Sequence, residues 1–539
     1  MIISRTCLAF ALAVAVLLGA PALAADWPQW GGSEPGRNMV AAETGLPDSF
    51  DPGKKTPQGV EPGSAEHVRW AVRLGSHVYG NATVADGKVF VGTDDALLAG
   101  DDRLERTKSG MVKCLDEKTG RLLWQLLTPK RTKSQLPPGA HYGQQNCGTC
   151  SSPAVADGRV YVVTSACEMV CFDADGLADG NDGPFKDEGQ YMVPRGKKPV
   201  ELIDTDADII WVFDMVRELN ACPHDVASCS ALVVDGFVYT TTSNGLDGPH
   251  KKCIRPDAPS LICLDAETGR LVASDNEKIG HRMYHCTWSP PSMGVVNGKK
   301  LIFFGGGDGV CYAFEAVTEA RDEPLHLKKV WSYDCNPPEY KFFEDGKPIP
   351  YYRGDKRKKY STNKNDGKYV GPSQIISTPV FHDGRVYVTI GQDPAHGRGR
   401  GMLHCIDPTG TGDITTSGRI WANDDVERTM ASVAVAGGLL YVVDFAGRLQ
   451  CLEPDTGKRI WLRELKAETW ATPLVADGKV FVGTKSHVCI LKAGREPGDP
   501  VKIRLGAPSY ATPVAANGTL FVASQNYLWA VEKGATIQP

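Results

Sequence analysis

The sequence lacks several patterns that would assign a chemistry at once. No histidine follows the second cysteine of "NCGTC" (146–150), because Ser151 stands there, and this excludes covalent haem attachment at that motif. No second C-x-x-C completes a zinc pattern. Lys and Arg number 59 against 64 Asp and Glu, and a net charge of −5 argues against nucleic acid as a partner. No apolar run after residue 24 approaches the roughly 20 residues of a membrane span, so we expect no transmembrane segment.

The N-terminus has the pattern of an export signal. Arg5 supplies positive charge, "CLAFALAVAVLLG" (7–19) is apolar, and Ala22 and Ala24 form an A-x-A cleavage pattern. The sequence therefore predicts a periplasmic or secreted protein with a signal at 1–24. The remaining segments are an N-terminal extension at 25–65 and a C-terminal tail at 534–539.

Turn residues are abundant, with 58 Gly and 36 Pro. The stretches "ATPLVADGKVFVGT" (471–484) and "ATPVAANGTLFVAS" (511–524) each predict a β-hairpin around a D-G or N-G turn. Eight copies of this unit recur, and a second hairpin with a T-G-type turn follows each. The second hairpin often closes on tryptophan, at Trp70, Trp124, Trp211, Trp331, Trp421 and Trp461, with Ala273 in one copy.

Eight units of four strands predict an all-β, eight-bladed β-propeller of four-stranded antiparallel blades over residues 66–533. The last copy (510–533) supplies three strands, and "EHVRWAVRL" (66–74) would complete its blade and close the ring. The alternative is eight hairpins in a sandwich or in two domains. We expect "DWPQWGG" (26–32) to pack its tryptophans on the propeller or on a partner.

The pattern "DGKVFVGT…CLDEKTGRLLW" (86–124) resembles the pyrroloquinoline-quinone-like (PQQ-like) propeller repeat over about residues 66–533. That repeat is shared by quinoprotein alcohol dehydrogenases and by the propeller lipoprotein of the outer-membrane protein assembly machinery. A dehydrogenase would imply PQQ on the axis, held by calcium above two adjacent cysteines, with an aspartate as base. No Cys-Cys dipeptide occurs here, and no motif assigns the catalytic aspartate. PQQ therefore lacks a matching cofactor motif.

Sixteen cysteines divide into three sets. Cys7 lies in the signal. Seven align at one strand position and are expected to be buried, unpaired thiols, namely Cys114, Cys171, Cys263, Cys311, Cys405, Cys451 and Cys489. Eight more map to one face of blades 2 to 5: Cys147, Cys150, Cys167, Cys222, Cys229, Cys253, Cys286 and Cys335.

These eight cysteines have two interpretations. In an exported chain, disulfides would staple the loops, with no pairing assigned. Alternatively the face holds a metal or redox site, since mixed Cys/His sets suit zinc or copper. The candidate residues for that site are His141, Cys147, Cys150, Cys222, His224, Cys229, His285 and Cys286. Long insertions at 94–110, 243–260 and 334–376 are expected on the same face.

The stretch "DADGLADGNDGPFKDE" (173–188) has two interpretations as well. Asp173, Asp175, Asp179 and Asp182 could bind calcium on the opposite face, or the stretch is a polar turn. For the whole chain we expect a monomeric binding or scaffold protein that engages a protein, peptide or glycan through its loop-rich face. The alternative is a quinoprotein dehydrogenase or a metal or redox oxidoreductase on the propeller axis.

Overall fold

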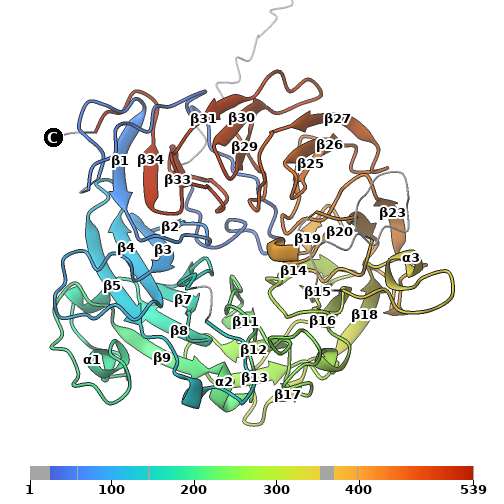
Figure 1. The fold of residues 1–539 in the computed structure, drawn as a ribbon, viewed down its shortest axis with the longest axis horizontal. Helices are drawn as coiled ribbons and strands as arrows, with labels where there is room; N and C mark the ends of the chain where they lie inside the picture. Colours follow the sequence, from blue (N-terminus) through green and yellow to red (C-terminus); the bar gives the residue numbers. More distant parts are fainter. Residues whose placement is uncertain (1–24, 58, 144–145, 352–369, 397, 538–539) are drawn as a thin grey trace, which may run out of the picture.

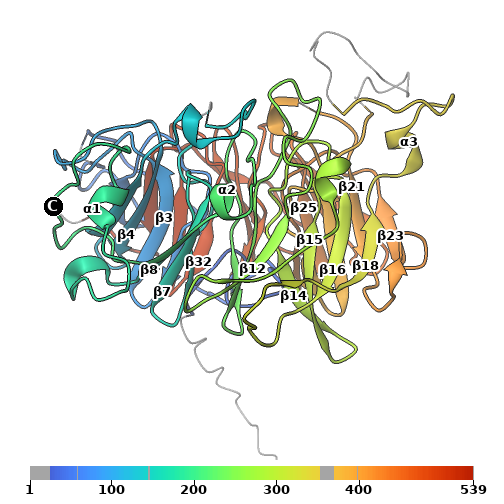
Figure 2. The same ribbon diagram turned by 90° about the horizontal axis from the view of Figure 1, so that it is seen from below.

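The computed structural model describes residues 25–57, 59–143, 146–351, 370–396 and 398–537. Their strands form eight separate sheets, which stand around a common axis as the blades of one ring (Figure 1). Seen from the side, the strands run between two loop-bearing faces (Figure 2). The predicted eight-bladed propeller is confirmed, and the sandwich alternative is wrong. The export signal predicted at 1–24 lies outside the described residues.

Each blade starts with a short strand at the axis and ends with a strand at the rim. Blades 1 to 4 comprise β2 (Thr83–Ala85), β3 (Lys88–Asp94), β4 (Gly110–Asp116), β5 (Leu122–Thr128); β6 (Ala154–Ala156), β7 (Arg159–Val163), β8 (Glu168–Asp173), β9 (Ile209–Asp214); β10 (Leu232–Val234), β11 (Phe237–Thr241), β12 (Leu261–Asp265), β13 (Leu271–Ser274); β14 (Ser292–Val296), β15 (Lys299–Gly305), β16 (Val310–Glu315) and β18 (Lys329–Asp334).

Blades 5 to 8 comprise β19 (Val380–His382), β20 (Arg385–Ile390), β21 (Met402–Ile406), β23 (Arg419–Asn423); β24 (Ala434–Ala436), β25 (Leu439–Val443), β26 (Arg448–Leu452), β27 (Arg459–Glu464); β28 (Leu474–Ala476), β29 (Lys479–Gly483), β30 (Val488–Lys492), β31 (Val501–Ile503); β32 (Val514–Ala516), β33 (Thr519–Ala523), β34 (Tyr527–Val531) and β1 (Val68–Arg73).

Short elements decorate this ring. Two strands add a fifth, parallel strand to blades 3 and 4, which the repeat did not predict; they are β17 (Leu325–His326) and β22 (Gly412–Asp413). The helices are α1 (Glu188–Tyr191), α2 (Met215–Glu218), α3 (Pro338–Lys341) and the 3₁₀ turns η1 (Lys133–Gln135), η2 (Gly176–Ala178), η3 (Ile279–His281) and η4 (Pro394–His396). Among the described residues, no helix is long and apolar enough to cross a membrane.

The N-terminal strand closes the ring as predicted. Strand β1 pairs with β34 in antiparallel fashion, with Trp70 opposite Ala530. Blade 8 is therefore built from both ends of the propeller sequence. Strand β1 thereby covers the edge of β34 and forms the outer strand of the blade.

Tryptophan side chains at the closing position join neighbouring blades. Each indole N–H donates to a carbonyl in the turn between the third and fourth strands of the next blade, at 2.8–3.2 Å, for Trp70, Trp124, Trp211, Trp331, Trp421 and Trp461. Four of the rings also lie against a glycine of that turn, with so little space that a Cβ on Gly457 would lie 2.5 Å from the Trp421 ring. The tryptophan repeat is thus a contact between blades.

The strand cysteines are free and buried, as expected, but two are out of register. Cys114, Cys171, Cys263, Cys405 and Cys451 lie opposite the closing position. In blade 4, Ala313 faces Trp331, whereas Cys311 faces Tyr333. In blade 7, Ile490 faces Phe481 at the equivalent site, and Cys489 faces Val482. Cys311 and Cys489 therefore do not share the common position, because they lie two residues and one residue before it along their strands.

A belt of hydrogen bonds surrounds the axis. The main-chain N–H at the start of one inner strand donates to a side-chain oxygen of the next blade at 2.8–3.0 Å, through Asn81, Ser152, Ser230, Thr378, Ser432, Thr472 and Thr512. Pro290 occupies the equivalent position in blade 4. Proline has neither N–H nor hydroxyl, so the belt is broken there, and within the described part of the chain the buried Thr378 Oγ1 has no hydrogen-bond partner.

The N-terminal segment 26–43 lies as a strap across one end of the axis and crosses the centre of the ring in dark blue (Figure 1). It bonds to the inner strands in blade order, first to Val84, Val155 and Val233, then to Met293, Phe381, Val435 and Val475. These contacts lie three residues beyond the belt along each strand. Trp27 and Arg37 are buried, so this extension packs on the propeller.

We expect the inter-blade tryptophan contact to be visible in a matched pair of glycine variants. Gly457 and Gly478 have similar φ values of +68° and +65°, and only Gly457 is in contact with a tryptophan. Both Gly→Ala changes carry the left-handed backbone penalty of about 1–2 kcal/mol. Gly457→Ala adds an overpacking penalty of about 1–3 kcal/mol. Chemical denaturation should show the lower stability for Gly457→Ala, and equal stabilities would contradict the contact's role.

Candidate functional site

The axis carries a blind pocket of about 580 Å³ that opens on the face opposite the strap. Its wall is one position of the repeat, two residues before the belt in each blade: Tyr79, Cys150, Ser228, Trp288, Ile376, Met430, Trp470 and Tyr510. The belt residues line the next layer, and Trp30 of the strap lines the pocket as well. The strap therefore makes the propeller channel a closed-ended cavity.

Three aromatic rings on this wall lie parallel to one another. Trp470 and Tyr510 stack with ring centroids 4.0 Å apart and an interplanar angle of 14°. Tyr79 is nearly parallel to both, at 5.6 Å from Trp470 and 6.0 Å from Tyr510. Blades 7, 8 and 1 thus contribute a stack of three near-parallel rings, which forms an aromatic surface on the cavity wall. The position of these three aromatic residues could have been predicted from the sequence, because all three precede the same small-residue motif of the repeat.

Charged groups surround the mouth of the pocket. Glu468 and Lys485 form an ion pair at 3.2 Å, and Arg398 also lines the pocket. Asp393 is half-buried, and desolvation raises the pKa of its carboxyl to about 6. Burial also raises the pKa of Asp225, although its Oδ1 lies 3.2 Å from Nε2 of His141.

Cys147 and Cys150 lie together at the pocket wall and are chemically unequal. A hydrogen bond from the Cys150 thiol lowers the pKa of Cys147, and further stabilisation comes from His77 and Tyr79. The same contact, together with burial, raises the pKa of Cys150. The first cysteine of the C-x-x-C motif is therefore the one that ionises more readily, which is the asymmetry that a reactive thiol pair needs.

All eight non-repeat cysteines are free in the structure, so the expected disulfides are not formed there. Burial raises the pKa of Cys167, Cys222, Cys229, Cys253, Cys286 and Cys335. Those six thiols are thus held in the protonated form, whereas metal coordination uses the thiolate. The metal or redox role proposed for Cys222, Cys229 and Cys286 gains no support from their surroundings and stays a prediction.

Histidines of the loop-rich face form a cluster beside the pocket. The ring centroid of His224 lies 5.2 Å from that of His141, 4.8 Å from His250 and 4.5 Å from His285. His396 lies 5.5 Å from His285. Desolvation lowers the pKa of His224 to about 4 and that of His285 well below its ordinary value, so both rings are neutral.

Sequence reasoning found three of these histidines and missed His250 and His396. Both lie in loops that the repeat places on the same face, "GLDGPHKKC" (245–253) and "GQDPAHGRGRG" (391–401). Their loop position was therefore a usable signal. The distance between His250 and His396 could not be predicted, because it depends on how the loops fold back over the ring.

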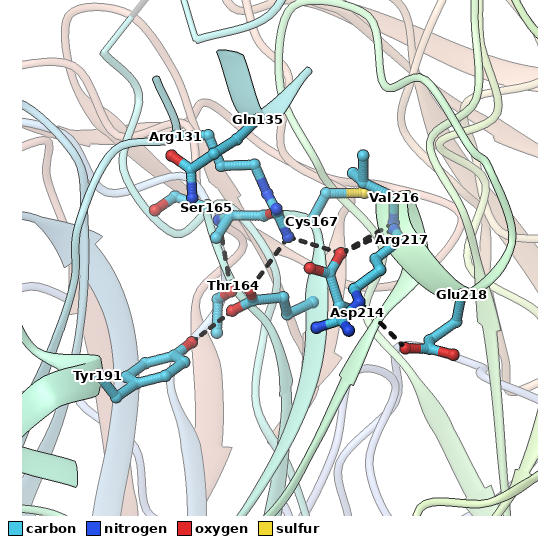
Figure 3. Close-up of polar contacts among 12 residues, drawn as sticks. Arg131, Gln135, Thr164, Ser165, Cys167, Tyr191, Asp214, Val216, Arg217 and Glu218 are labelled. Carbon is cyan, nitrogen blue, oxygen red and sulfur yellow. Dashed lines mark hydrogen bonds and ion pairs between the residues drawn. The ribbon is translucent and has the colours of Figure 1, made fainter. Parts of the chain in front are cut away.

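A partly buried ion-pair network anchors two of the loops (Figure 3). Arg131 lies 2.7 Å from Asp214 and 3.0 Å from Glu168, and Tyr191 donates to Glu168 at 2.6 Å. Asp214 also caps α2 through two main-chain N–H groups. Arg131 begins the segment that leads to Cys147, and α2 precedes the segment that leads to the histidine cluster. The network thus anchors the two segments that lead to Cys147 and to the histidine cluster.

The comparisons with known proteins agree with the fold. A family model described as outer membrane protein assembly factor BamB matches residues 108–178 and 399–501. No curated protein sequence matches the chain. The resemblance to the PQQ-like propeller repeat is confirmed.

Solved structures of both expected kinds are similar. A europium-containing methanol dehydrogenase is 14% identical with a TM-score of 0.52, covering 95% of this chain and 90% of its own. BamB from Moraxella catarrhalis is 13% identical with a TM-score of 0.48, covering 86% and 97%. A quinohemoprotein alcohol dehydrogenase from Comamonas testosteroni is 13% identical with a TM-score of 0.42, covering 95% and 82%. At these identities the likeness shows the fold and assigns no activity.

The aspartate loop lies after β8, in the turn between the third and fourth strands of blade 2. Oxygens of Asp173, Asp175 and Asp179 lie within 4.8 Å of one another, while Asp182 is not in that group. Lys88 lies 3.0 Å from Asp175 and offsets part of the negative charge. Calcium binding stays a prediction.

Calcium should raise the melting temperature of the wild type if the loop binds it, because a ligand of the folded state alone stabilises by mass action. The double change Asp175→Ala and Asp179→Ala should abolish that increase. The same changes at the exposed residues Asp322 and Asp383 should leave it intact. Equal melting temperatures with calcium and with chelator in the wild type would eliminate the site.

Cys147 should be the fastest of the described cysteines to react with iodoacetamide at neutral pH, because its lowered pKa gives the larger thiolate fraction. Replacing Cys150 with alanine removes the stabilising hydrogen bond and should slow that reaction. A time course of alkylation by peptide mass spectrometry measures both rates. Labelling of the half-buried Cys253 as fast as Cys147 would show that the assigned asymmetry is wrong.

Proposed function

We propose that the chain is a binding protein that holds a planar ring of its ligand in the axial pocket of its loop-rich face. The observation that carries this proposal is the aromatic surface of Trp470, Tyr510 and Tyr79 on the wall of a closed-ended cavity. A cavity of about 580 Å³ lies within the usual size range of small-ligand sites. Stacking on such a surface contributes about 1–3 kcal/mol per ring.

The belt adds directional chemistry to this apolar surface. Each belt hydroxyl that accepts a main-chain N–H still has its own O–H to donate. Arg398 and the Lys485–Glu468 ion pair add charged groups that can bond to oxygens at the mouth. A ring with carbonyl, hydroxyl or carboxylate oxygens therefore suits the pocket, either as a free molecule or at the tip of a peptide or glycan. The export signal expected at 1–24 would put this binding in the periplasm or outside the cell.

A quinoprotein dehydrogenase is the second candidate, and one observation favours it. Cys147 and Cys150 line the same pocket as the aromatic surface, where the resemblance implies a pair of cysteines next to the quinone. A planar quinone suits this wall. The residues do not suit calcium, since Glu468 is paired with Lys485, Asp225 with His141, and Asp393 has a raised pKa. We therefore derive no reaction step through this cofactor.

Binding of the planar dye anilinonaphthalene sulfonate tests the proposal. We expect Trp470→Ala to weaken the dye's affinity about tenfold, the loss of about 1.4 kcal/mol of stacking. Phe342→Ala removes an exposed aromatic outside the pocket and should leave the affinity unchanged. Unchanged binding by Trp470→Ala would contradict the pocket as the site.

Two further experiments distinguish between the possible ligands. Native mass spectrometry of protein from its own compartment identifies a free small molecule or a bound peptide or glycan. Added PQQ with calcium, followed by reduction of a redox dye with an alcohol, tests the dehydrogenase. Dye reduction that depends on PQQ would replace the binding function with the second candidate.

A further inference from the structure

We propose that His224, His250 and His285 bind a divalent transition-metal ion, zinc or copper, on the loop-rich face. One ring nitrogen from each of the three residues lies within 4.8 Å of the others. The site lies beside the axial pocket and does not include its aromatic wall. The proposal is independent of the ligand proposed for that pocket.

The three histidines come from three loops that are held together before any ion binds. His224 follows α2, His250 lies between β11 and β12, and His285 precedes β14. Isolated β-bridges join these loops, pairing Pro223 with Asn244 and Gly245 with Cys286. The main-chain N–H of Leu246 also donates to the carbonyl of His285 at 2.9 Å.

A glycine makes the close approach of these loops possible. A Cβ on Gly245 would lie 2.6 Å from the Cβ of His224 and 2.8 Å from the Cβ of Cys286. No larger residue fits between these side chains without displacing them. The loop geometry is therefore fixed around the histidines, as a preorganised metal site requires.

The hydrogen bonds of His224 determine which of its nitrogens is available. Its Nδ1 lies 2.7 Å from the carbonyl oxygen of Leu246, and only an N–H can bond to a carbonyl. The neutral ring therefore carries its lone pair on Nε2. That atom is buried without a hydrogen-bond partner among the residues that the structure describes, and the nearby Asp225 Oδ2, at 3.5 Å, is also an acceptor. Two acceptors that face one another across a buried space are stabilised by a cation.

The other two rings present nitrogens at ligand spacing. Nε2 of His285 lies 3.1 Å from Nε2 of His250. Two nitrogens bound tetrahedrally to one ion at 2.0–2.1 Å would be about 3.3 Å apart. On its far side, Nδ1 of His285 lies 3.1 Å from the Cys286 sulfur, and the main chain of Gly248 hydrogen-bonds the His250 ring. Such contacts orient metal-binding imidazoles.

The donor set determines the class of ion. Three neutral imidazoles suit zinc, copper or nickel, whereas calcium and magnesium require oxygen ligands. Copper(II) should bind most tightly by the general order of divalent ions, and zinc matches the tetrahedral spacing. Three protein ligands leave a fourth position open for water or a substrate atom. The Asp225 carboxylate beside His224 would offset the positive charge of the ion.

Metal titration of the full chain tests the site. After treatment with chelator and dialysis, the wild type should bind one equivalent of zinc or copper(II) in competition with a chromophoric chelator. His224→Ala and His250→Ala should each weaken binding by at least about 100-fold, because second-shell changes alone cost 10–100-fold. His281→Ala changes an exposed histidine close by and should have no effect.

Two controls make the outcome decisive. Circular dichroism must show that each variant is folded, and His224→Gln replaces His224→Ala if the latter is not. Cobalt(II) added to the wild type should give the visible absorption of a tetrahedral nitrogen site, and Trp470→Ala should retain it. The proposal is overturned if the wild type does not bind one equivalent of the ion. It is also overturned if the folded His250→Ala and His224 variants bind the ion as tightly as the wild type does.

Discussion

The hydrogen-bond belt around the axis is the constraint on which the rest of the molecule depends. Except on either side of Pro290 in blade 4, it links the start of one inner strand to the next blade through a residue with a small polar side chain. Residues two positions earlier must then point into the axial space, and those three positions later must meet the strap. The position of the belt residues in the repeat therefore determines which residues form the wall of the pocket, how wide the pocket is, and which residues contact the strap at its closed end.

The belt is broken at Pro290, close in the sequence to the long loops around blade 4. Blade 4 follows the loop with His285, and the insertions at 243–260 and 334–376 flank it on either side. Loops on a rigid scaffold are where proteins place binding groups. Blade 3 also carries Ala273 in place of the closing tryptophan, so its junction with blade 4 lacks that contact, whereas Trp331 still joins blade 4 to blade 5.

The sequence was sufficient for the fold because the hairpin pattern, the turn glycines and the incomplete last blade all agree. The same repeat could have given the pocket wall, since Tyr79, Trp470 and Tyr510 occupy one position of it. The repeat failed for Cys311 and Cys489, which lie two residues and one residue before the common position of their strands. It could not give the histidine cluster, since loop paths between blades follow from packing and from contacts such as that of Gly245 with His224.

The central claim is that the functional surface is the pocketed, loop-rich face. A crystal structure of the protein isolated from its own compartment tests this claim most directly. The account predicts electron density for a ring lying parallel to Trp470 and Tyr510 in the axial pocket. Density for a ligand or partner on the opposite face, with only water in the pocket, would contradict it.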